Sequence, residues 1–364
     1  MIEPPDVMLF NDSMKDTAFE ALAAQVAGRP RAMLALARQV GGQRAAELVG
    51  DALAAAPGDT DIAAAGRAIL SALAPVWHFT IVHDQIRNDA YEAALRAAVR
   101  PGCTVLEIGA GSGLLAMMAA RAGAGKVVSC EANPAIAAAA RDIVAANGLA
   151  DRVTILAKHS SELDLEADLG GRADVLVSEI VSNDLLGQGA LPVMEQVVPT
   201  LLHPDARVIP ARGEIRVALA CDRQWDQLRM GQVSGFDLSA FDRFSPPVVE
   251  ISAASPRLDL RSDPAVLFAF DFASGGPFPA GPADVSLTSQ GGHVNGVVQW
   301  IALALDDRTT YENRPARAQP SCWAVMFHRF LSPLDTACGD VIQVNASHDR
   351  AGLTLWRPLG KTCG

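Results

Sequence analysis

The segment 104–188 constrains the fold of this chain more than any other part of its sequence. Short apolar runs such as TVLEI and ADVLV alternate there with alanine-rich stretches of helical length. This alternation predicts βαβ units, whose strands are buried on both faces and form a parallel sheet. The first strand leads directly into Gly109-Ala110-Gly111-Ser112-Gly113, and a helix is expected to begin at Leu114. Glycines at such a turn let a ligand approach backbone N–H groups, so the segment predicts a nucleotide site.

The spacing of these glycines narrows the choice of nucleotide. A dinucleotide fingerprint reads G-x-G-x-x-G, whereas this chain reads G-x-G-x-G and has Leu114 at the place of the third fingerprint glycine. No Lys-Ser or Lys-Thr pair follows, which excludes a P-loop. The next predicted strand ends at Glu131, whose carboxylate can hold a ribose diol. The pattern resembles the S-adenosylmethionine site of class I methyltransferases, although the glycines alone leave another Rossmann-like use open.

Composition limits the partners and the setting of the chain. A net charge of −11 and a pI near 5.1 argue against nucleic-acid binding, and they suit a basic peptide partner as well as simple solubility. The six cysteines form no C-x-x-C pair, so neither a metal site nor a disulfide framework is expected. No apolar run is long enough to cross a membrane. The N-terminal MIEPPDVMLFNDS lacks the features of a signal peptide, so a cytoplasmic protein is expected.

Changes in sequence texture divide the chain into three predicted parts. Residues 1–74 are mostly alanine-rich helix and predict either a helical cap or a short tetratricopeptide-type array that docks a peptide or packs a dimer. Residues 75–207 form the predicted Rossmann-like domain. In residues 208–364, short β-type runs such as CWAVMFHRFL and DVIQVNAS are separated by turns, which predicts a β-sandwich or barrel. An insertion at about 222–245 predicts an arm on that domain.

Several charged residues beside the predicted pocket are candidates for ligand binding. His78, Asp84 and Arg87 are separated by multiples of three residues, which predicts that they share one helical face. An arginine there can hold a carboxylate as a two-point pair, or it can form an exposed helix salt bridge. Asp84 and His78 are candidates for the substrate side of the pocket, and a hydrogen-bonded core histidine is the alternative for His78. The fourth predicted strand ends at Glu179, at the sheet edge where open α/β sheets bind ligands.

In this order the motifs resemble those of the protein arginine N-methyltransferases, above all the branches numbered seven and nine. The resemblance covers roughly residues 75–357 and is carried by WHFTIVHDQIRN, LEIGAGSGLLAMMAARAGA, KHSSEL, SEIVSNDLLGQGALP, VIPARGEI and PSCWAVMF. It implies a Rossmann-like class I methyltransferase domain followed by a β-barrel or sandwich. It also implies S-adenosyl-L-methionine as cofactor, S-adenosyl-L-homocysteine as product, an arginine-containing protein or peptide as acceptor, and a homodimer that pairs through the arm.

The resemblance assigns roles to residues by position. Arg87 would bind the methionine carboxylate of the cofactor, and Glu131 would hold the ribose hydroxyls. Ser161 and Glu162 would flank the adenine. Glu179 would be the first of two loop glutamates that clamp a guanidinium. The other cofactor contacts would be Glu107, Gly109, Gly111 and Gly113, and the other acceptor contacts would be His78, Asp84, Cys322 and Trp323.

The chain departs from the family at the second loop glutamate, because the residue nine positions after Glu179 is Gln188. Two carboxylates fix the guanidinium fork and leave one nitrogen a lone pair for attack. Gln188 accepts a hydrogen bond but carries no charge, and losing a desolvated charge partner costs about 2–5 kcal/mol. Asp184 in the same loop is either a replacement carboxylate or an exposed loop acid. Three alternatives remain: a slowed or retuned arginine methyltransferase, a methyltransferase for a non-arginine acceptor, and a cofactor-binding interaction protein without catalysis.

Overall fold

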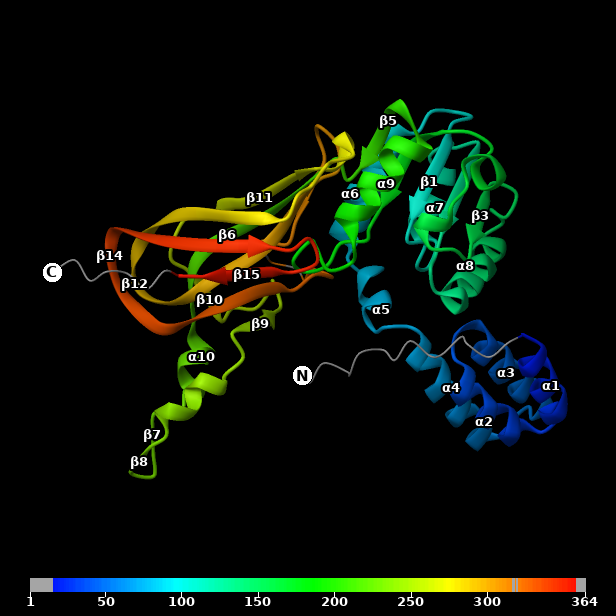
Figure 1. Ribbon diagram of the computed structural model, residues 1–364, viewed down its shortest axis with the longest axis horizontal. Coiled ribbons are helices and arrows are strands. Elements are labelled where there is room, and N and C mark those ends of the chain that lie inside the picture. The colour runs from blue at the N-terminus through cyan, green and yellow to red at the C-terminus, as the bar shows by residue number, and fades with distance from the viewer. Residues whose placement is uncertain (1–15, 316–317, 319, 358–364) are drawn as a thin grey trace.

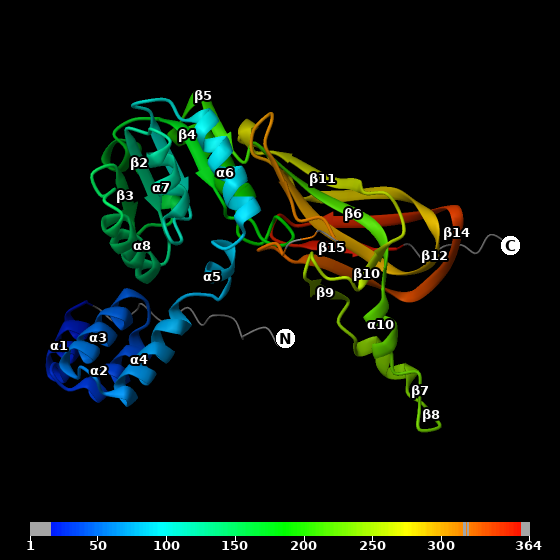
Figure 2. The same cartoon turned by 180° about the vertical axis from the view of Figure 1, so that it is seen from behind.

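The computed structural model describes residues 16–315, 318 and 320–357, so the N-terminal MIEPPDVMLFNDS lies outside the described residues. Three groups of elements follow one another along the chain: a helical bundle, an α/β domain and an antiparallel β domain (Figures 1 and 2). The bundle lies below the α/β domain in both views, and the β domain extends to one side. Within the described residues no helix has the length and apolar character that crossing a membrane requires.

The four helices of the bundle pack around an apolar core of their own. Asp59 caps α4, since its carboxylate accepts the backbone N–H groups of Asp61 and Ile62. Helices α3 and α4 approach closely at Gly66, where a Cβ atom would lie 2.9 Å from Val49 Cγ1. Helix α3 also contacts α8, so the bundle is attached to the α/β domain. The bounds are α1 (Asp16–Val26), α2 (Pro30–Val40), α3 (Gly42–Ala55) and α4 (Thr60–Leu73).

The α/β domain contains a five-stranded parallel sheet, as the sequence predicts. Its strand order is β3-β2-β1-β4-β5, so the order reverses direction on either side of β1. In open sheets of this kind, ligands bind outside the carboxyl ends of the strands at that point. The strands are β1 (Thr104–Ile108), β2 (Lys126–Cys130), β3 (Val153–Leu156), β4 (Ala173–Ser178) and β5 (Leu202–Ile209). The helices are α5 (Trp77–Ile81), α6 (Gln85–Ala98), α7 (Leu114–Arg121), α8 (Pro134–Ala146) and α9 (Ala190–Leu201).

The chain breaks between α5 and α6, so the prediction that His78, Asp84 and Arg87 share one helical face is wrong. Helix α5 ends at Ile81 and α6 begins at Gln85. Asp84 has a non-helical backbone, and its carboxylate accepts the backbone N–H of Arg87 at 3.0 Å. A side chain that caps the following helix cannot also continue the preceding one. His78 and Arg87 therefore lie on separate helices.

The β domain is an eight-stranded antiparallel sheet, which agrees with the predicted all-β part. From Val325 onward the run CWAVMFHRFL belongs to the same long strand, β14, as DVIQVNAS, and the two runs do not form two strands as the sequence suggests. Strand β12 is equally long, and two bulges along its pairing with β14 let both strands bend. At Gly296 a Cβ atom would lie 2.4 Å from the His328 carbonyl oxygen, so only glycine permits this approach. The strands are β6 (Arg212–Asp222), β9 (Val248–Ile251), β10 (Leu258–Leu260), β11 (Ala265–Asp271), β12 (Gly281–Ala304), β13 (Thr310–Glu312), β14 (Val325–His348) and β15 (Leu353–Trp356).

An arm, residues 223–244, leaves the β domain between β6 and β9 and projects away from it (Figures 1 and 2). Three phenylalanines of the arm, Phe236, Phe241 and Phe244, are 72%, 58% and 65% exposed. Clustered apolar surface of this kind marks a contact with another molecule. The arm comprises α10 (Arg223–Leu228), β7 (Gln232–Val233), β8 (Phe236–Asp237) and a 3-10 helix (Ser239–Phe244).

Candidate active site

A cavity of about 780 Å³ opens at the carboxyl ends of the parallel strands. Its volume lies in the range of about 300–1,000 Å³ that is typical of small-molecule sites. The wall contains the glycine turn after β1, Glu131 after β2 and Glu179 after β4. The segment 322–324 closes the cavity from the side of the β domain. Residues from both domains therefore meet in one hollow at the switch point of the sheet.

The three glycines of the turn all have a backbone conformation that side chains resist. The φ angles are 84° at Gly109, 50° at Gly111 and 78° at Gly113. A Cβ atom on Gly109 would lie 2.8 Å from Ile180 Cγ2. On Gly111 it would touch His78, at 3.9 Å from Cδ2. Glycine thus permits the positive φ angles and the close approach of Ile180, and the turn forms part of the cavity wall.

Glu131 is fixed at the cavity wall by backbone donors. Its two carboxylate oxygens accept the N–H of Gly111 at 3.0 Å and the N–H of Asn133 at 2.9 Å. The Asn133 side chain in turn donates to the Leu73 carbonyl at the end of α4, at 2.9 Å. The carboxylate is therefore oriented before any ligand arrives, and the helical bundle is tied to the same loop.

The turn after β3 reaches the cavity through different residues from those assigned to adenine. Ser161 and Glu162 do not line the cavity, whereas the three residues before them, 158–160, do. The Glu162 carboxylate accepts the backbone N–H of His159 at 2.8 Å, and Ser161 Oγ lies 2.8 Å from His159 Nδ1. The Glu162 carboxylate thereby forms part of the cap of a short 3-10 helix (Ser160–Glu162), and the Ser161 hydroxyl contacts the His159 ring that completes the cap.

Glu107 lies at the base of the cavity and is only 1% exposed. Its carboxyl group accepts a hydrogen bond from the Ser129 hydroxyl. Burial raises the pKa of Glu107 to about 8, although the Ser129 hydrogen bond and the charge of Arg87 oppose the shift. The side chain is therefore protonated at neutral pH.

This raised pKa predicts a pH dependence of stability that Glu107→Gln removes. Between pH 4.5 and about 8 the unfolded chain releases the Glu107 proton and the folded protein keeps it. The free energy of unfolding should therefore fall as pH rises through this window, by about 1.4 kcal/mol per pH unit from this group. The amide of the variant does not titrate, so its stability should exceed that of the wild type increasingly toward pH 8. Urea unfolding of both proteins at several pH values measures the difference, and parallel pH profiles would contradict the prediction.

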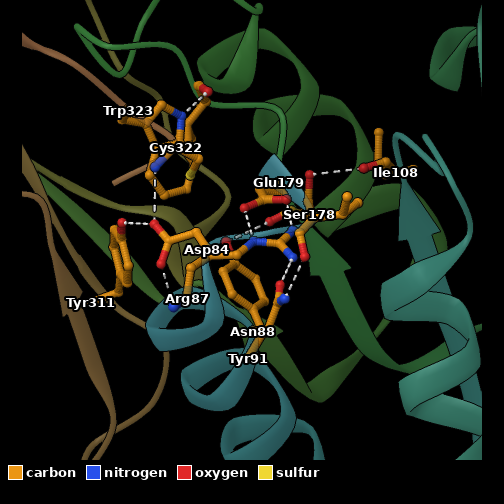
Figure 3. A network of polar contacts seen from close by, with 12 residues as sticks. Asp84, Arg87, Asn88, Tyr91, Ile108, Ser178, Glu179, Tyr311, Cys322 and Trp323 are labelled. Atoms are coloured by element: carbon orange, nitrogen blue, oxygen red, sulfur yellow. Dashed lines mark hydrogen bonds and ion pairs between the residues drawn. The ribbon is translucent and has the colours of Figure 1, made fainter. Parts of the chain in front are cut away.

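Arg87 and Glu179 form a two-point ion pair inside the cavity (Figure 3). Nε and Nη2 of Arg87 donate to Oε1 and Oε2 of Glu179, and the two side chains are 4% and 6% exposed. The third arm of the guanidinium donates to Asn88 Oδ1 at 2.6 Å, and the Tyr91 ring packs against its face. Burial lowers the pKa of Arg87, which nearby groups partly offset. The carboxylate at the end of β4 thus holds a guanidinium fork.

Buried leucines anchor the loop that follows Glu179. Leu185 and Leu186 are fully buried, and Leu185 has a φ of 71°, which is rare outside glycine. Trp323 donates its indole N–H to the Val181 carbonyl at 3.0 Å, which joins the loop to the β domain. The loop is therefore held at both its base and its middle, next to the cavity.

Gln188 stands at the position of the second loop glutamate, and Asp184 is the candidate replacement carboxylate in the same loop. The structure places these two residues differently. Gln188 lines the cavity, at its exposed part. Asp184 does not line it, because its carboxylate accepts the Ser182 hydroxyl and the N–H groups of Leu186 and Gly187. Asp184 therefore stabilises the loop through hydrogen bonds within it and supplies no carboxylate to the cavity wall.

Asp84 joins the α/β domain to the β domain and does not line the cavity (Figure 3). Its Oδ1 caps α6 at Arg87, and its Oδ2 accepts the Tyr311 hydroxyl and the N–H of Cys322. These partners come from strand β13 and from the segment before β14. The placement gives Asp84 a structural role instead of the substrate contact that the sequence suggested.

Asp84→Ala is expected to destabilise the protein by about 2–4 kcal/mol, because three buried donors lose their acceptor. Asp89→Ala, on the same helix but exposed, is the matched control and should change stability little. Urea unfolding measures both variants. Unchanged stability together with a raised KM for the acceptor would instead place Asp84 in substrate binding.

Cys322, Trp323 and His78, which the resemblance assigns to the acceptor side, all line the cavity. Burial raises the pKa of the Cys322 thiol to about 12, so the thiol stays protonated. The His78 ring stacks on Trp77 with ring centroids 3.7 Å apart, and burial lowers its pKa. These groups shape the cavity and carry no charge there at neutral pH.

Two cavity residues, Asn183 and Glu250, escaped the sequence reasoning. Glu250 lies on β9, and Asn183 Nδ2 donates to its Oε1 at 2.9 Å. Asn183 Oδ1 accepts the N–H of Ala324 at 2.9 Å. In the sequence Glu250 reads as one polar residue in a β-type run, and no local signal points it toward a loop 67 residues away.

Comparison with known proteins identifies relatives of this chain. The sequence model of the ribosomal protein L11 methyltransferase (PrmA) family matches residues 92–207. An arginine N(omega)-methyltransferase of Streptomyces achromogenes subsp. streptozoticus is 39% identical over 277 residues, which are 74% of this chain and 74% of the relative. Protein arginine N-methyltransferase 7 of Oryza sativa subsp. japonica is 32% identical over 279 residues, which are 68% of this chain but only 38% of the relative.

Two solved structures share the fold. The Trypanosoma brucei PRMT1 enzyme–prozyme heterotetrameric complex with AdoHcy superposes with a TM-score of 0.65 at 24% identity, over 74% of this chain and 86% of the other. Arabidopsis thaliana protein arginine methyltransferase 10 gives a TM-score of 0.61 at 18% identity, over 76% and 88%. At these sequence identities the structural similarity shows the fold alone. The bacterial relative, 39% identical over 74% of both chains, confirms the resemblance found in the sequence: the chain belongs to the arginine N-methyltransferase family of S-adenosylmethionine-dependent enzymes.

Proposed function

We propose that this protein transfers a methyl group from S-adenosylmethionine to a terminal guanidinium nitrogen of arginine in a protein or peptide. The observation that carries the proposal is the Arg87–Glu179 pair in the cavity. A carboxylate that receives a planar fork at two points suits an arginine acceptor, because a lysine ammonium cannot match that geometry. The net charge of −11 also suits a basic acceptor.

The residues of the cavity fit the proposed cofactor. The glycine turn lines the cavity, and Glu131 is oriented to accept ribose hydroxyls. The segment 158–160 lines the same cavity and would flank the adenine. Arg87 supplies a buried guanidinium for the methionine carboxylate. When bound, S-adenosylmethionine supplies a methyl group on a positively charged sulfur, which is a good leaving group.

Glu179 would orient the acceptor for an in-line displacement. Its carboxylate accepts two guanidinium N–H groups and keeps positive charge on the nitrogens it contacts, so the remaining nitrogen can attack. That nitrogen forms a bond to the methyl carbon while the sulfur–carbon bond breaks, and it then gives up one proton. The Glu179 carboxylate would accept this proton. Alignment and charge placement supply most of the rate enhancement.

The Arg87–Glu179 pair implies an order of binding. The Glu179 carboxylate cannot pair with an acceptor guanidinium at two points while both its oxygens accept N–H groups of Arg87. The cofactor carboxylate offers Arg87 a second anionic partner, which lets Glu179 turn to the acceptor. We therefore propose that the cofactor binds before the acceptor.

A transfer assay tests the proposed function. The protein is incubated with methyl-labelled S-adenosylmethionine and an arginine-rich peptide, and the acid hydrolysate is analysed for methylated arginine by mass spectrometry. The expected result is label in methylarginine, with none transferred to the same peptide carrying lysine in place of arginine. Absence of label at high enzyme concentration contradicts the proposal, and label on a different residue type favours a non-arginine acceptor.

Free arginine is a second candidate acceptor. The bacterial relative is named for arginine and not for protein arginine, and it matches over 74% of both chains. Running L-arginine beside the peptide in the same assay decides between them, because the preferred acceptor has the higher kcat/KM.

A homodimer and a cytoplasmic location stay predictions. The exposed phenylalanines of the arm support pairing of two copies through residues 223–244. A molar mass near twice 38.2 kDa by light scattering is the expected result, and a monomeric mass would contradict it.

A further inference from the structure

We propose that Glu250 of the β domain is the second carboxylate of the acceptor site and supplies the charge that Gln188 lacks. This inference rests on the proposed arginine methylation. It assigns the second acid group to strand β9 and not to the loop after β4.

The position of Glu250 supports this role. It lines the same cavity as Glu179 and Gln188, and β9 pairs with β14 so that Glu250 lies opposite Met326. The neighbouring Ile251 is 3% exposed and packs into the core of the β domain. Because successive side chains of a strand point to opposite faces, Glu250 is directed away from that core.

A specific contact orients the Glu250 carboxylate. Asn183 donates to Oε1 at 2.9 Å, and the same asparagine accepts the N–H of Ala324 at 2.9 Å. The loop after β4, the segment before β14 and strand β9 are thereby joined at one point. Oε2 has no hydrogen-bond partner among the residues that the structure describes, so it can accept an N–H group of an acceptor.

The other carboxylates of the cavity have different tasks. Glu107 is protonated at neutral pH and accepts a hydrogen bond from Ser129. Glu131 is held by the glycine turn on the cofactor side. Glu179 lies deep in the cavity, and Glu250 is exposed at its edge. Among the described residues that line the cavity, Glu250 is therefore the one further anionic group that an arginine side chain entering toward Glu179 can meet.

Two variants test the assignment. Glu250→Gln keeps the shape and the contact with Asn183 but removes the charge, and it is expected to lower kcat/KM for the arginine acceptor about tenfold. The affinity for S-adenosylmethionine should stay within about twofold, since Glu250 lies on the acceptor side. Adding Gln188→Glu to Glu250→Gln should restore most of the lost activity, which a purely structural role of Glu250 would not allow. Asp284→Asn, an exposed acid of the β domain outside the cavity, is the matched control and should change neither value.

A parallel experiment measures the affinity for the arginine acceptor by calorimetry. The acceptor is titrated into the wild type and into Glu250→Gln, each loaded with S-adenosylhomocysteine. Weaker acceptor binding by the variant supports the proposal even where turnover is slow. Activity and acceptor affinity that match the wild type overturn it, and so does a loss that Gln188→Glu fails to restore. If the wild type neither methylates nor binds any arginine acceptor, the proposed function itself fails. A wild type that methylates arginine and a variant that does so equally well overturn only the role of Glu250.

Discussion

Glu179→Gln is expected to lower kcat/KM for the arginine acceptor by about a thousandfold, the largest loss predicted for any single change in this protein. The amide cannot receive two N–H groups of a guanidinium, and it removes the charge that holds the fork deep in the cavity. Gln188 already contributes no charge on the same loop, so the loop would then present no acid group to the acceptor. Initial rates with saturating labelled S-adenosylmethionine measure the effect.

The control for Glu179→Gln is Glu214→Gln, which removes a carboxylate of the β domain that pairs with Arg216 outside the cavity. That variant should keep wild-type activity. A loss of less than about tenfold in Glu179→Gln would show that another group orients the acceptor.

Glu179→Gln should also change how the cofactor stabilises the protein. Without its carboxylate partner, the Arg87 guanidinium is left buried and unpaired, which costs about 3–5 kcal/mol. A bound cofactor carboxylate would replace the missing partner. The rise in Tm on adding S-adenosylmethionine should therefore be larger in the variant than in the wild type, and an equal rise would place the cofactor carboxylate away from Arg87.

Arg87→Met is expected to weaken S-adenosylmethionine binding by about a hundredfold. The variant keeps much of the side-chain volume but removes the buried guanidinium that would pair with the methionine carboxylate. Arg87→Lys separates charge from geometry, since a lysine keeps the charge but offers no planar fork, and a loss of about tenfold is expected for it. Isothermal titration calorimetry gives Kd for each protein.

Arg96→Met is the matched control for these arginine variants, because Arg96 lies on the same helix but its side chain is 66% exposed. It should bind the cofactor as the wild type does. If Arg87→Met bound S-adenosylmethionine within about threefold of the wild type, Arg87 would serve only to hold Glu179.

Several features of the site follow from local sequence, and each has a local physical cause. The glycine turn is predictable because positive φ angles at the end of a buried strand require glycine. The positions of Glu131 and Glu179 follow because carboxyl ends of parallel strands meet at one edge of the sheet. The resemblance to a family gave the expectation that Arg87 binds the cofactor carboxylate, and the structure places Arg87 in the cavity wall. Its pairing with Glu179, 92 residues away, was not predictable from spacing.

Other predictions were displaced by contacts that the local pattern does not contain. The three-residue spacing from His78 to Arg87 suggested one helix, but Asp84 caps a new one and bonds to Cys322, 238 residues later. Ser161 and Glu162 looked placed to meet adenine, yet both side chains bond to His159 at the cap of the short 3-10 helix, and residues 158–160 line the cavity instead.

By itself, then, the sequence determined the parallel sheet, the glycine turn, the acids at the strand ends and the missing charge at Gln188. These features depend on backbone conformation and on burial that repeats over a few residues. Only the tertiary structure decided that Asp84 joins two domains, that the Arg87 guanidinium pairs with the Glu179 carboxylate, and that Glu250 reaches the cavity. Such pairings depend on how elements far apart in the sequence pack against one another, and periodicity within a segment carries no information about that packing.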